Sequence, residues 1–545
     1  MESALSPGER SADDQTFVDD IEGYPASLRV RPGETVELHV STRAAAWSVT
    51  IERWGAQREI VYEREGLIGE YHPPPPDADA NGCGWPVGLA VRVPEAWRSG
   101  FYLVTMQAKG ADPTRAVSHA GFVVSGAADP AARPSTVYVL ATNTWNAYNT
   151  WGGRSLYTGG TAVSFHRPFA RGMLDRPHVD RDDRKARPTR YGETPDADGQ
   201  IFQTYRTTNN YPSAIGSTGW FSLGRRFVEW AEAEGHLFDM VISSDLETDP
   251  EALAGYETVL LVGHDEYWSV GERAAVERHV ASGGRLVSFS GNTMFWRVRH
   301  SSGTHGSTMV CHKYAASETD RAEADPVHPG PVTGLWAEPA IGAPEWTLLG
   351  AGSAFGLYHR FGQATPQGVA GYLVSRPDHW LFAGTGLGYG DVVGRDEGVV
   401  GYETVGCPLT LDDYHQPVPS ADALRRGVPA ETEIVAWVPA SNVGVGEYPA
   451  SIAALSDQGD LEFIAERIFG DDPDPERRAR NGNSVIATVG DQVVTIGTTD
   501  WVYGLASDPQ VAQITRNALA GLSPASRRQR PPTGPVAHVV RYPLL

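Results

Sequence analysis

Residues that could do chemistry gather in two short stretches of the chain. In "GHDEYW", which follows an apolar run, His264 and Glu266 lie two positions apart and would point to the same side of an extended chain. The aromatic, glycine-rich stretch 143–160, "NTWNAYNTWGGRSLYTGG", supplies Tyr148 and Tyr157. Imidazole and carboxylate groups transfer protons, and phenolate and carboxylate oxygens bind hard metal ions. The two stretches therefore indicate a site for acid–base chemistry or metal binding.

A nucleophilic triad fits these residues less well than a metal site does. The nearest serine to the motif, Ser290 in "FSGN", lacks the G-x-S-x-G frame of a nucleophile elbow. Three scattered cysteines give neither a disulfide framework nor a zinc site, and none has the sequence context of a nucleophile: Cys83, Cys311 and Cys407. Tyrosine and glutamate oxygens suit ferric iron rather than zinc or copper, and a bound metal lowers the pKa of a phenol.

A structural role for the same side chains stays open at this point. Tyr148, Trp151 and Tyr157 would then be half-buried aromatic residues that pack their loop onto a sheet, with the hydroxyls bonded to backbone groups. His264 would cap the helix that follows it. Composition alone favours this structural reading over the metal site.

Alternating strands and helices are expected to position both stretches. Four short apolar runs predict buried strands: 136–144, 238–245, 256–268 and 285–296. Two amphipathic stretches predict helices, 221–236 and 269–284. The second has Ser269 as N-cap, Glu272 three residues later and Gly-Gly at its end, which is a capping box with a C-cap. The order predicts a doubly wound, mostly parallel sheet with its ligand site in loops at the strand C-termini.

The rest of the chain divides by composition. We expect a flexible tail over 1–16, a β-sandwich domain over 17–126, an α/β domain with β-rich insertions over 127–525, and a C-terminal extension over 526–545. Period-two alternation of apolar and polar residues predicts the sandwich, and helices give way to strands between about 330 and 500. The proline-rich loop 69–86 is long enough to cover a site.

Charge and hydropathy exclude several kinds of partner. The 545 residues carry a formal net charge of −22, from 67 acidic and 45 basic side chains, which argues against nucleic acid or an anionic membrane as the main partner. Apolar runs fall short of the roughly 20 residues that span a bilayer, and the first residues lack the pattern of a signal peptide. We expect a cytoplasmic protein.

Several motifs together resemble the large (β) subunit of N,N-dimethylformamidase and its relatives. They are "VPEAWRSGFY" (93–102), "NTWNAYNTWGGRSLY" (143–157), "GHDEYWSVGERAAVERHVASGGRLVSFSGNTMFWRVR" (263–299) and "GTTDWVYGLA" (497–506). The resemblance implies a β-sandwich-like domain beside an α/β core similar to the class I glutamine amidotransferase fold, without its cysteine nucleophile. It also implies one ferric iron held by two tyrosines and one glutamate, with a histidine assisting.

The family's residues carry over to positions in this chain. Its H-x-E motif matches His264 and Glu266, which the resemblance makes catalytic, with Glu266 also a metal ligand. Tyr148 in "NAYN" matches the first tyrosine ligand. Tyr157 is predicted as the second, with Tyr191 in reserve because the family's two tyrosines lie further apart in sequence. Six further residues are predicted to line the substrate pocket: Trp145, Trp151, Asn210, Tyr211, Asn292 and Phe295.

These residues predict an iron-dependent hydrolase of a non-peptide C–N amide bond, with a small N-substituted formamide or a related amide as substrate. Glu266 or His264 would take a proton from water, and His264 would pass one to the leaving amine. Two other functions stay open: a catalytically inactive, amidotransferase-like binding or assembly protein, and an iron enzyme of redox or lyase type in a biosynthetic pathway. We expect a homo-oligomer, and a separate small subunit is left open.

Overall fold

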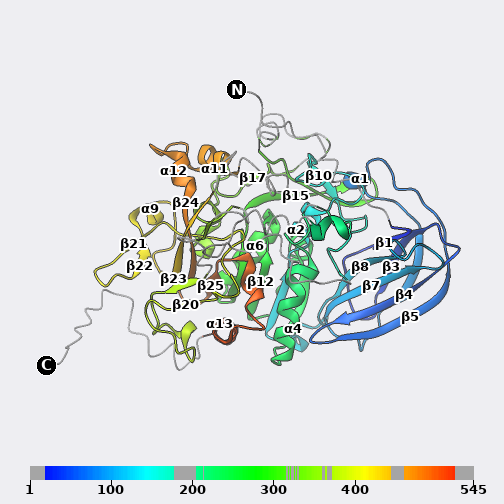
Figure 1. Cartoon of the computed structure of the whole chain (residues 1–545), viewed down its shortest axis with the longest axis horizontal. Helices are drawn as coiled ribbons and strands as arrows, with labels where there is room; N and C mark the ends of the chain where they lie inside the picture. Colours follow the sequence, from blue (N-terminus) through cyan, green and yellow to red (C-terminus); the bar gives the residue numbers. More distant parts are fainter. Residues whose placement is uncertain are drawn as a thin grey trace.

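The computed structural model shows a mixed α/β protein with several sheets. It describes residues 19–176, 204–212, 214–314, 330–358, 371–442 and 460–521, with a few isolated positions between them. A β-rich N-terminal region, blue in Figure 1, lies at one side of a central α/β region, and the C-terminal strands lie at the other side. Tyr191 and the predicted terminal segments 1–16 and 526–545 fall outside the described residues.

Two sheets make up the N-terminal region. Strands β1 (Ile21–Pro25), β3 (Thr35–Thr42) and β6 (Val87–Arg92) form one, in the order β1-β3-β6. The other has the order β2-β8-β7-β4-β5, from β2 (Arg29–Val30), β4 (Ala46–Trp54), β5 (Arg58–Ile68), β7 (Gly100–Ala108) and β8 (Val117–Val124). Buried and partly exposed residues alternate along β4, as the period-two pattern predicts. Both sheets contribute to one apolar core, in which Leu38 joins Ile51 and Val104.

A ten-stranded mixed sheet forms the centre of the molecule. Its parallel half has the order β11-β9-β12-β14-β25, from β9 (Thr136–Leu140), β11 (Asp239–Ile242), β12 (Thr258–His264), β14 (Arg285–Gly291) and β25 (Val493–Ile496). Antiparallel strands extend it: β24 (Asn481–Val489), β23 (Thr432–Ser441), β19 (Tyr372–Val374) and β20 (Val392–Val393), with β18 (Gln363–Ala364) beside β23. The parallel strands are apolar runs because helices cover both of their faces.

Helices cover the two faces of this sheet in turn. On one face, α4 (Arg225–Ala233) and α13 (Pro509–Ala520) share an apolar cluster with Leu260 of β12. On the other, α5 (Ser243–Thr248), α6 (Val270–Ala281) and α8 (Trp346–Leu349) share a cluster with Leu261. The predicted capping box is confirmed, because Ser269 Oγ accepts a hydrogen bond from the Glu272 N–H and the Glu272 carboxylate accepts one from Ser269. The helix predicted over 221–236 begins as a π-helical turn, Trp220–Gly224.

Smaller elements complete the fold. Strands β10 (Ala162–Ser164), β13 (Tyr267–Ser269), β15 (Trp296–Gly303), β16 (Gly306–Val310) and β17 (Gly334–Leu335) form a further sheet. Strands β21 (Leu409–Leu411) and β22 (Pro417–Pro419) form a hairpin. The remaining helices include α1 (Ala78–Asn81), α2 (Thr142–Tyr148), α9 (Ala421–Arg425), α11 (Asp460–Phe469) and α12 (Pro475–Arg480). Helices are therefore more frequent after residue 330 than the sequence predicted.

The aromatic stretch 143–160 differs from its prediction as a loop. Residues Thr142–Tyr148 form helix α2, and the irregular chain begins at Asn149. The glycines of the stretch all come later, from Gly152 onward, so the residues of α2 carry no strong helix breaker. Tyr148 is therefore held on a helix that follows β9 directly.

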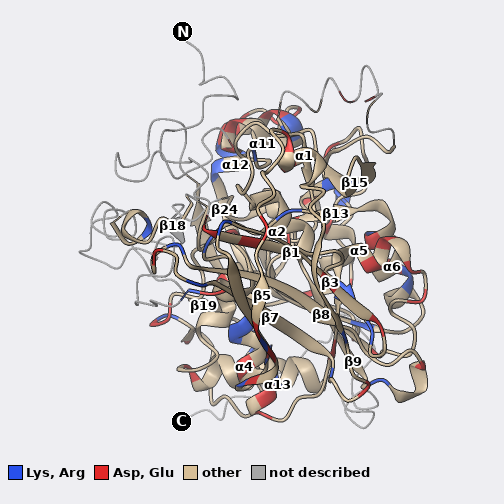
Figure 2. Cartoon of the chain, turned by 90° about the vertical axis from the view of Figure 1, so that its right-hand side faces the viewer, with Lys and Arg blue, Asp and Glu red and all other residues tan. Residues whose placement is uncertain are grey.

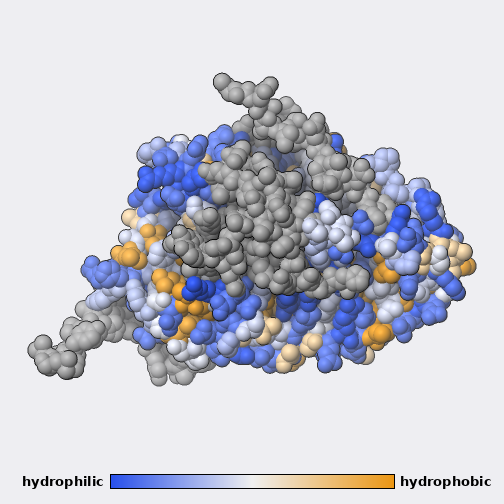
Figure 3. Space-filling view, in the orientation of Figure 1, coloured by the Kyte–Doolittle hydropathy of each residue, from blue (hydrophilic) through white to orange (hydrophobic). Residues whose placement is uncertain are grey.

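The surface gives no sign of one dominant charged patch in the views drawn. Acidic and basic residues are interspersed in Figure 2, including on α6. In Figure 3 the described surface is mostly hydrophilic, with scattered hydrophobic patches. Within the described residues, each helix is too short or too polar to cross a membrane.

Candidate metal centre

The H-x-E motif sits on a bend between two strands. His264 is the last residue of β12, and β13 begins at Tyr267, so Glu266 lies in the turn between two sheets. The backbone N–H of Glu266 donates to Thr144 Oγ1 of α2 at 2.9 Å. Tyr148 is four residues beyond Thr144 and lies on the same helix face. This hydrogen bond therefore holds the helix face that carries Tyr148 close to Glu266.

Both predicted tyrosine ligands contact the Glu266 carboxylate. Tyr148 Oη lies 3.1 Å from Glu266 Oε2, and Tyr157 Oη lies 2.8 and 2.7 Å from the two carboxylate oxygens. The centroids of the two phenol rings are 4.2 Å apart. Tyr267, which sequence analysis passed over as a site residue, donates from its hydroxyl to Tyr157 Oη at 2.8 Å. The structure thus brings Tyr148, Tyr157 and Glu266 together.

The loop that carries Tyr157 reverses direction at two glycines. Gly152 and Gly153 have φ angles of 76° and 153°, a region that favours glycine. A Cβ at Gly153 would lie 2.6 Å from the Asp79 carboxylate, so the loop approaches α1 of the N-terminal region closely. The Arg154 N–H donates to Asp79 Oδ2 at 2.5 Å. Part of the proline-rich loop 69–86 therefore supports the segment between the two tyrosines.

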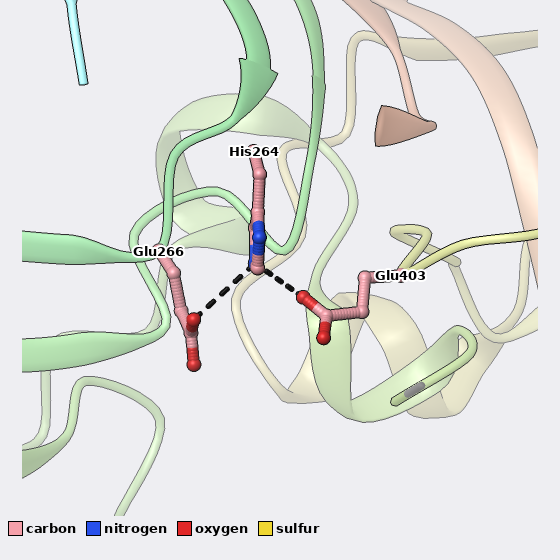
Figure 4. A group of neighbouring side chains, drawn as sticks. All are labelled: His264, Glu266 and Glu403. Atoms are coloured by element: carbon pink, nitrogen blue, oxygen red, sulfur yellow. Dashed lines mark ion pairs between the residues drawn. The ribbon is translucent and has the colours of Figure 1, made fainter. Parts of the chain in front are cut away.

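A second carboxylate, that of Glu403, completes the cluster. His264, Glu266 and Glu403 offer ligand atoms that lie within 4.8 Å of one another, and all three side chains are buried. Figure 4 shows the imidazole ring between the two carboxylates. His264 Nε2 lies 3.2 Å from Glu266 Oε2 and is also paired with Glu403. Asn292 Nδ2 donates to Glu403 Oε2 at 2.9 Å. This buried group could hold one metal ion.

The backbone around the cluster is unusual. Asn292 and Glu403 have φ angles of 51° and 34°, in the left-handed region that residues other than glycine rarely adopt. Such conformations persist where the surrounding structure holds them, and they are frequent at functional sites. The strained pair is joined by the hydrogen bond between its own side chains.

The electrostatics of the cluster follow from burial and opposite charge. Burial lowers the pKa of His264, but the carboxylates of Glu403 and Glu266 raise it to about 10. Burial raises the pKa of Glu266, yet His264 holds it below its usual value. The pKa of Tyr148 is raised well above its ordinary value by burial and by the charge of Glu266. A bound cation would reverse the effect on the phenol.

The donor set fits a metal ion. His264 Nε2 is buried beside two carboxylates, yet it has no well-directed hydrogen bond among the described residues. Its Nδ1 instead lies 3.0 Å from the Ser217 carbonyl oxygen, which fixes the ring. Carboxylate and phenol oxygens with one imidazole are ligands for hard or borderline cations. His264, Glu266 and Glu403 could thus hold one metal ion, with the two predicted tyrosines beside them.

A small cavity of about 10 Å³ borders the cluster. Glu266, Glu403 and Tyr157 line it, as do two predicted pocket residues, Asn292 and Phe295. The structure therefore places these two at the site.

The other predicted pocket residues lie elsewhere. Asn210 and Tyr211 line a separate cavity of about 870 Å³ beside the N-terminal sheet β2-β8-β7-β4-β5. Trp145 packs edge-on against Phe101, and Trp151 packs edge-on against Trp85 at 5.7 Å between ring centroids. Both tryptophans belong to the main apolar core. Four of the six predicted pocket residues are thus apart from the small cavity's lining.

Sequence reasoning missed Glu403 and the buried Lys313, which also lines the small cavity. Glu403 follows β20 in "GYETVG", more than a hundred residues beyond the H-x-E motif, with no motif to mark it. Lys313 follows β16 in "CHKY". Lysine occurs at just three positions in the chain, and that scarcity is the signal that points to Lys313.

Comparison with known proteins identifies the family of the chain. A family model described as "N,N-dimethylformamidase beta subunit-like, C-terminal" matches residues 48–515. The chain belongs to this family. The match includes every residue of the cluster.

Other comparisons add little. No curated protein matches the chain. One similar solved structure is titled "Structural basis of T cell specificity and activation by the bacterial superantigen toxic shock syndrome toxin-1". It is 14% identical, covers 19% of this chain and 95% of that chain, and has a TM-score of 0.13. A TM-score this low carries no argument about fold or function.

Proposed function

We propose that this protein is an iron-dependent amidohydrolase that cleaves a non-peptide C–N bond in a small N-substituted formamide or a related amide. One observation carries the proposal: two phenol oxygens lie within 3.1 Å of one buried carboxylate, beside a histidine and a second carboxylate. Membership of the dimethylformamidase β-subunit-like family supports an amidase-like activity. The mixed sheet with helices on both faces is compatible with an amidotransferase-like core that uses no cysteine nucleophile.

Tyr148, Tyr157 and Glu266 are the proposed ligands of one ferric ion, and His264 and Glu403 lie directly beside them. Anionic oxygen ligands favour ferric iron over softer ions. When bound, the iron would polarise the amide carbonyl and lower the pKa of water in the site. The side chains in this chain must then move the protons and exclude solvent.

His264 is placed to exchange a proton at Nε2. Its Nδ1 faces the Ser217 carbonyl oxygen, which makes Nδ1 the protonated nitrogen of the neutral ring. Nε2 faces the carboxylates of Glu266 and Glu403. We assign to His264 the transfer of a proton to the leaving amine.

Glu403 is the carboxylate best placed to take a proton from water. Glu266 already accepts hydrogen bonds from Tyr148 and Tyr157. Glu403 borders the small cavity and is oriented by Asn292. Burial of the whole group keeps bulk water away, which strengthens each electrostatic interaction.

Release of formate and amine from a panel of formamides tests the proposal. We expect hydrolysis of at least one N-substituted formamide, and loss of at least about a hundredfold in kcat/KM in Tyr148→Phe and Glu266→Ala. Circular dichroism and thermal unfolding would check that both variants fold. Failure of every amide with a folded, metal-loaded protein would contradict the proposal, as would full activity in Glu266→Ala.

A further inference from the structure

Lys313 is a buried cation in the wall of the small cavity. Its side chain is 7% exposed, and it borders the same space as Glu266 and Glu403. The other two lysines of the chain are Lys109, which is exposed, and Lys185, which lies outside the described residues. Arginine supplies nearly all the other positive charge of the chain, so a compact lysine ammonium at this position is unusual for this protein.

Aromatic rings surround the Lys313 ammonium. Nζ lies 3.3 Å from the ring centroid of Tyr157, 5.0 Å from that of Trp296 and 5.1 Å from that of Tyr314. These rings attract a cation through their faces, and they hold Nζ in place. A ring face does not replace the oxygen atoms to which an ammonium donates hydrogen bonds.

The ammonium makes no hydrogen bond or ion pair with any residue that the structure describes. Burying a charged donor without an acceptor is costly. An acceptor from outside the protein, a water molecule or a ligand, would remove that cost. Lys313 therefore points to a ligand with a negatively polarised oxygen.

Most of the other donors that line the cavity already make hydrogen bonds. The Asn292 amide donates to Glu403, the Tyr314 hydroxyl donates to Asp460, and the Tyr157 hydroxyl donates to Glu266. The Tyr358 hydroxyl donates to the backbone. Among the described lining residues, Lys313 and the Trp296 indole are the donors left to meet an oxygen of the substrate, and Lys313 is the charged one.

We infer that Lys313 binds the oxygen that becomes anionic during amide hydrolysis, first as the tetrahedral oxyanion and then as an oxygen of the product carboxylate. This inference rests on the proposed function. Water forms a bond to the carbonyl carbon, and the π electron pair moves to the carbonyl oxygen that faces Lys313. The water gives one proton to Glu403. The C–N bond then breaks as the amine receives a proton from His264. The product acid gives its remaining hydroxyl proton back to His264, so that a carboxylate remains beside Lys313.

The site suits this role physically. A donor fixed before the reaction stabilises the developing charge without reorganising, and removing such a donor lowers kcat by roughly a hundredfold to a thousandfold. The low dielectric of a buried site strengthens the attraction between ammonium and oxyanion. For a formamide substrate the product held by Lys313 is formate.

Binding of formate tests the inference without turnover. Isothermal titration calorimetry would measure formate affinity in the purified wild-type protein, in Lys313→Met and in the control Lys109→Met, which removes the same charge from an exposed position. Methionine keeps most of the apolar stem, and circular dichroism would check folding. We expect wild type and Lys109→Met to bind formate equally, Lys313→Met to bind at least tenfold more weakly, and Lys313→Arg to recover part of the loss.

The same variants separate this inference from the proposed function. Formate binding that depends on Lys313 in a protein that hydrolyses no amide would support the anion site and count against amide hydrolysis. Amide hydrolysis with equal formate affinity in wild type and Lys313→Met would overturn the inference and leave the proposed function standing. Absence of formate binding to the wild-type protein at millimolar concentrations would also overturn it.

Discussion

The molecule has two cavities that differ in size and in the state of their charged groups. The large one, of about 870 Å³, lies beside the N-terminal sheet, and the small one, of about 10 Å³, lies beside Glu266. In the large cavity Arg58 pairs with Glu52 and Asp175. In the small cavity a histidine, two carboxylates and two phenols converge where one cation would satisfy them. The convergence of several ionisable side chains, more than volume, distinguishes the candidate site.

Perturbed ionisation alone would not separate the two cavities. In the large cavity, burial raises the pKa of Glu22 to about 8 and that of Asp19 to about 7. Asp19 is paired with Arg171 at 2.8 Å, and Glu22 accepts the Asp19 backbone N–H. These shifts report burial of hydrogen-bonded carboxyl groups. In the small cavity the shifted groups belong to one cluster, in which His264 Nε2 lies 3.2 Å from Glu266 Oε2.

The largest difference between the two cavities is expected in the kcat of variants in which a lining glutamate is replaced. Glu403→Gln should lower kcat by about a hundredfold or more, because it removes the carboxylate that takes a proton from water. Glu63→Gln, in the wall of the large cavity, should leave kcat unchanged. Formate release under saturating amide would measure both. Equal kcat in the two variants would remove the assigned role of Glu403.

The next largest difference is expected in the kcat/KM of variants at two asparagines, one in each cavity. Asn292 and Asn210 both have left-handed backbone, with φ of 51° and 56°, and each lines one cavity. Glycine accepts this backbone without strain. Asn292→Gly should lower kcat/KM roughly tenfold or more because Glu403 loses its orienting partner. Asn210→Gly should stay within about twofold of wild type, and a large loss there would move substrate binding to the large cavity.

Substitution of two tyrosines, one beside each cavity, should give a smaller difference, which is measured as metal affinity. Tyr267→Phe removes the hydroxyl that donates to Tyr157, and such an orienting bond is worth about tenfold in metal affinity. Tyr211→Phe, in the large cavity, should leave the affinity unchanged. Competition with a chelator would compare the two variants. Unchanged metal retention in Tyr267→Phe would argue against Tyr157 as a ligand.

The smallest effect concerns stability and pH in the large cavity. The pKa of Glu22 in the folded protein, about 8, lies above the ordinary glutamate pKa of 4.5. Its contribution to stability is therefore fully present below pH 4.5 and is lost as pH rises through about 8. Glu22→Gln should raise the unfolding temperature relative to wild type at pH 8 and change it little at pH 5. Thermal unfolding across this range would measure the difference. A variant that is less stable than wild type at pH 8 would contradict the assigned ionisation.

Local patterns and the family resemblance together predicted part of the site. His264 and Glu266 share a strand-end motif, and the capping box that begins at Ser269 fixes the start of the next helix. Both depend on residues within a few positions of one another, which is where spacing rules apply. The parallel strands and the helices beside them followed from the same kind of periodicity, whereas the antiparallel half of the sheet makes it mixed rather than mostly parallel.

The missed parts depend on long-range packing. Glu403 reaches His264 because the chain after β20 returns to the C-terminal end of the parallel strands, which no local pattern reveals. The helix at Thr142–Tyr148 was missed because glycines further along the stretch suggested a loop. The predicted pocket residues Asn210 and Tyr211 lie on a segment that folds against the N-terminal sheet instead. The choice of Tyr157 as second ligand stays a prediction, although its hydroxyl lies 2.7 Å from Glu266.

Metal analysis of the purified wild-type protein, read together with its visible spectrum, tests the central claim most directly. The account predicts one iron per chain and a visible absorption band from charge transfer between tyrosine phenolate and ferric iron. Loss of the band in Tyr148→Phe would assign it to the site. A colourless protein free of metal after growth with added iron, or one that holds zinc in place of iron, would contradict the account.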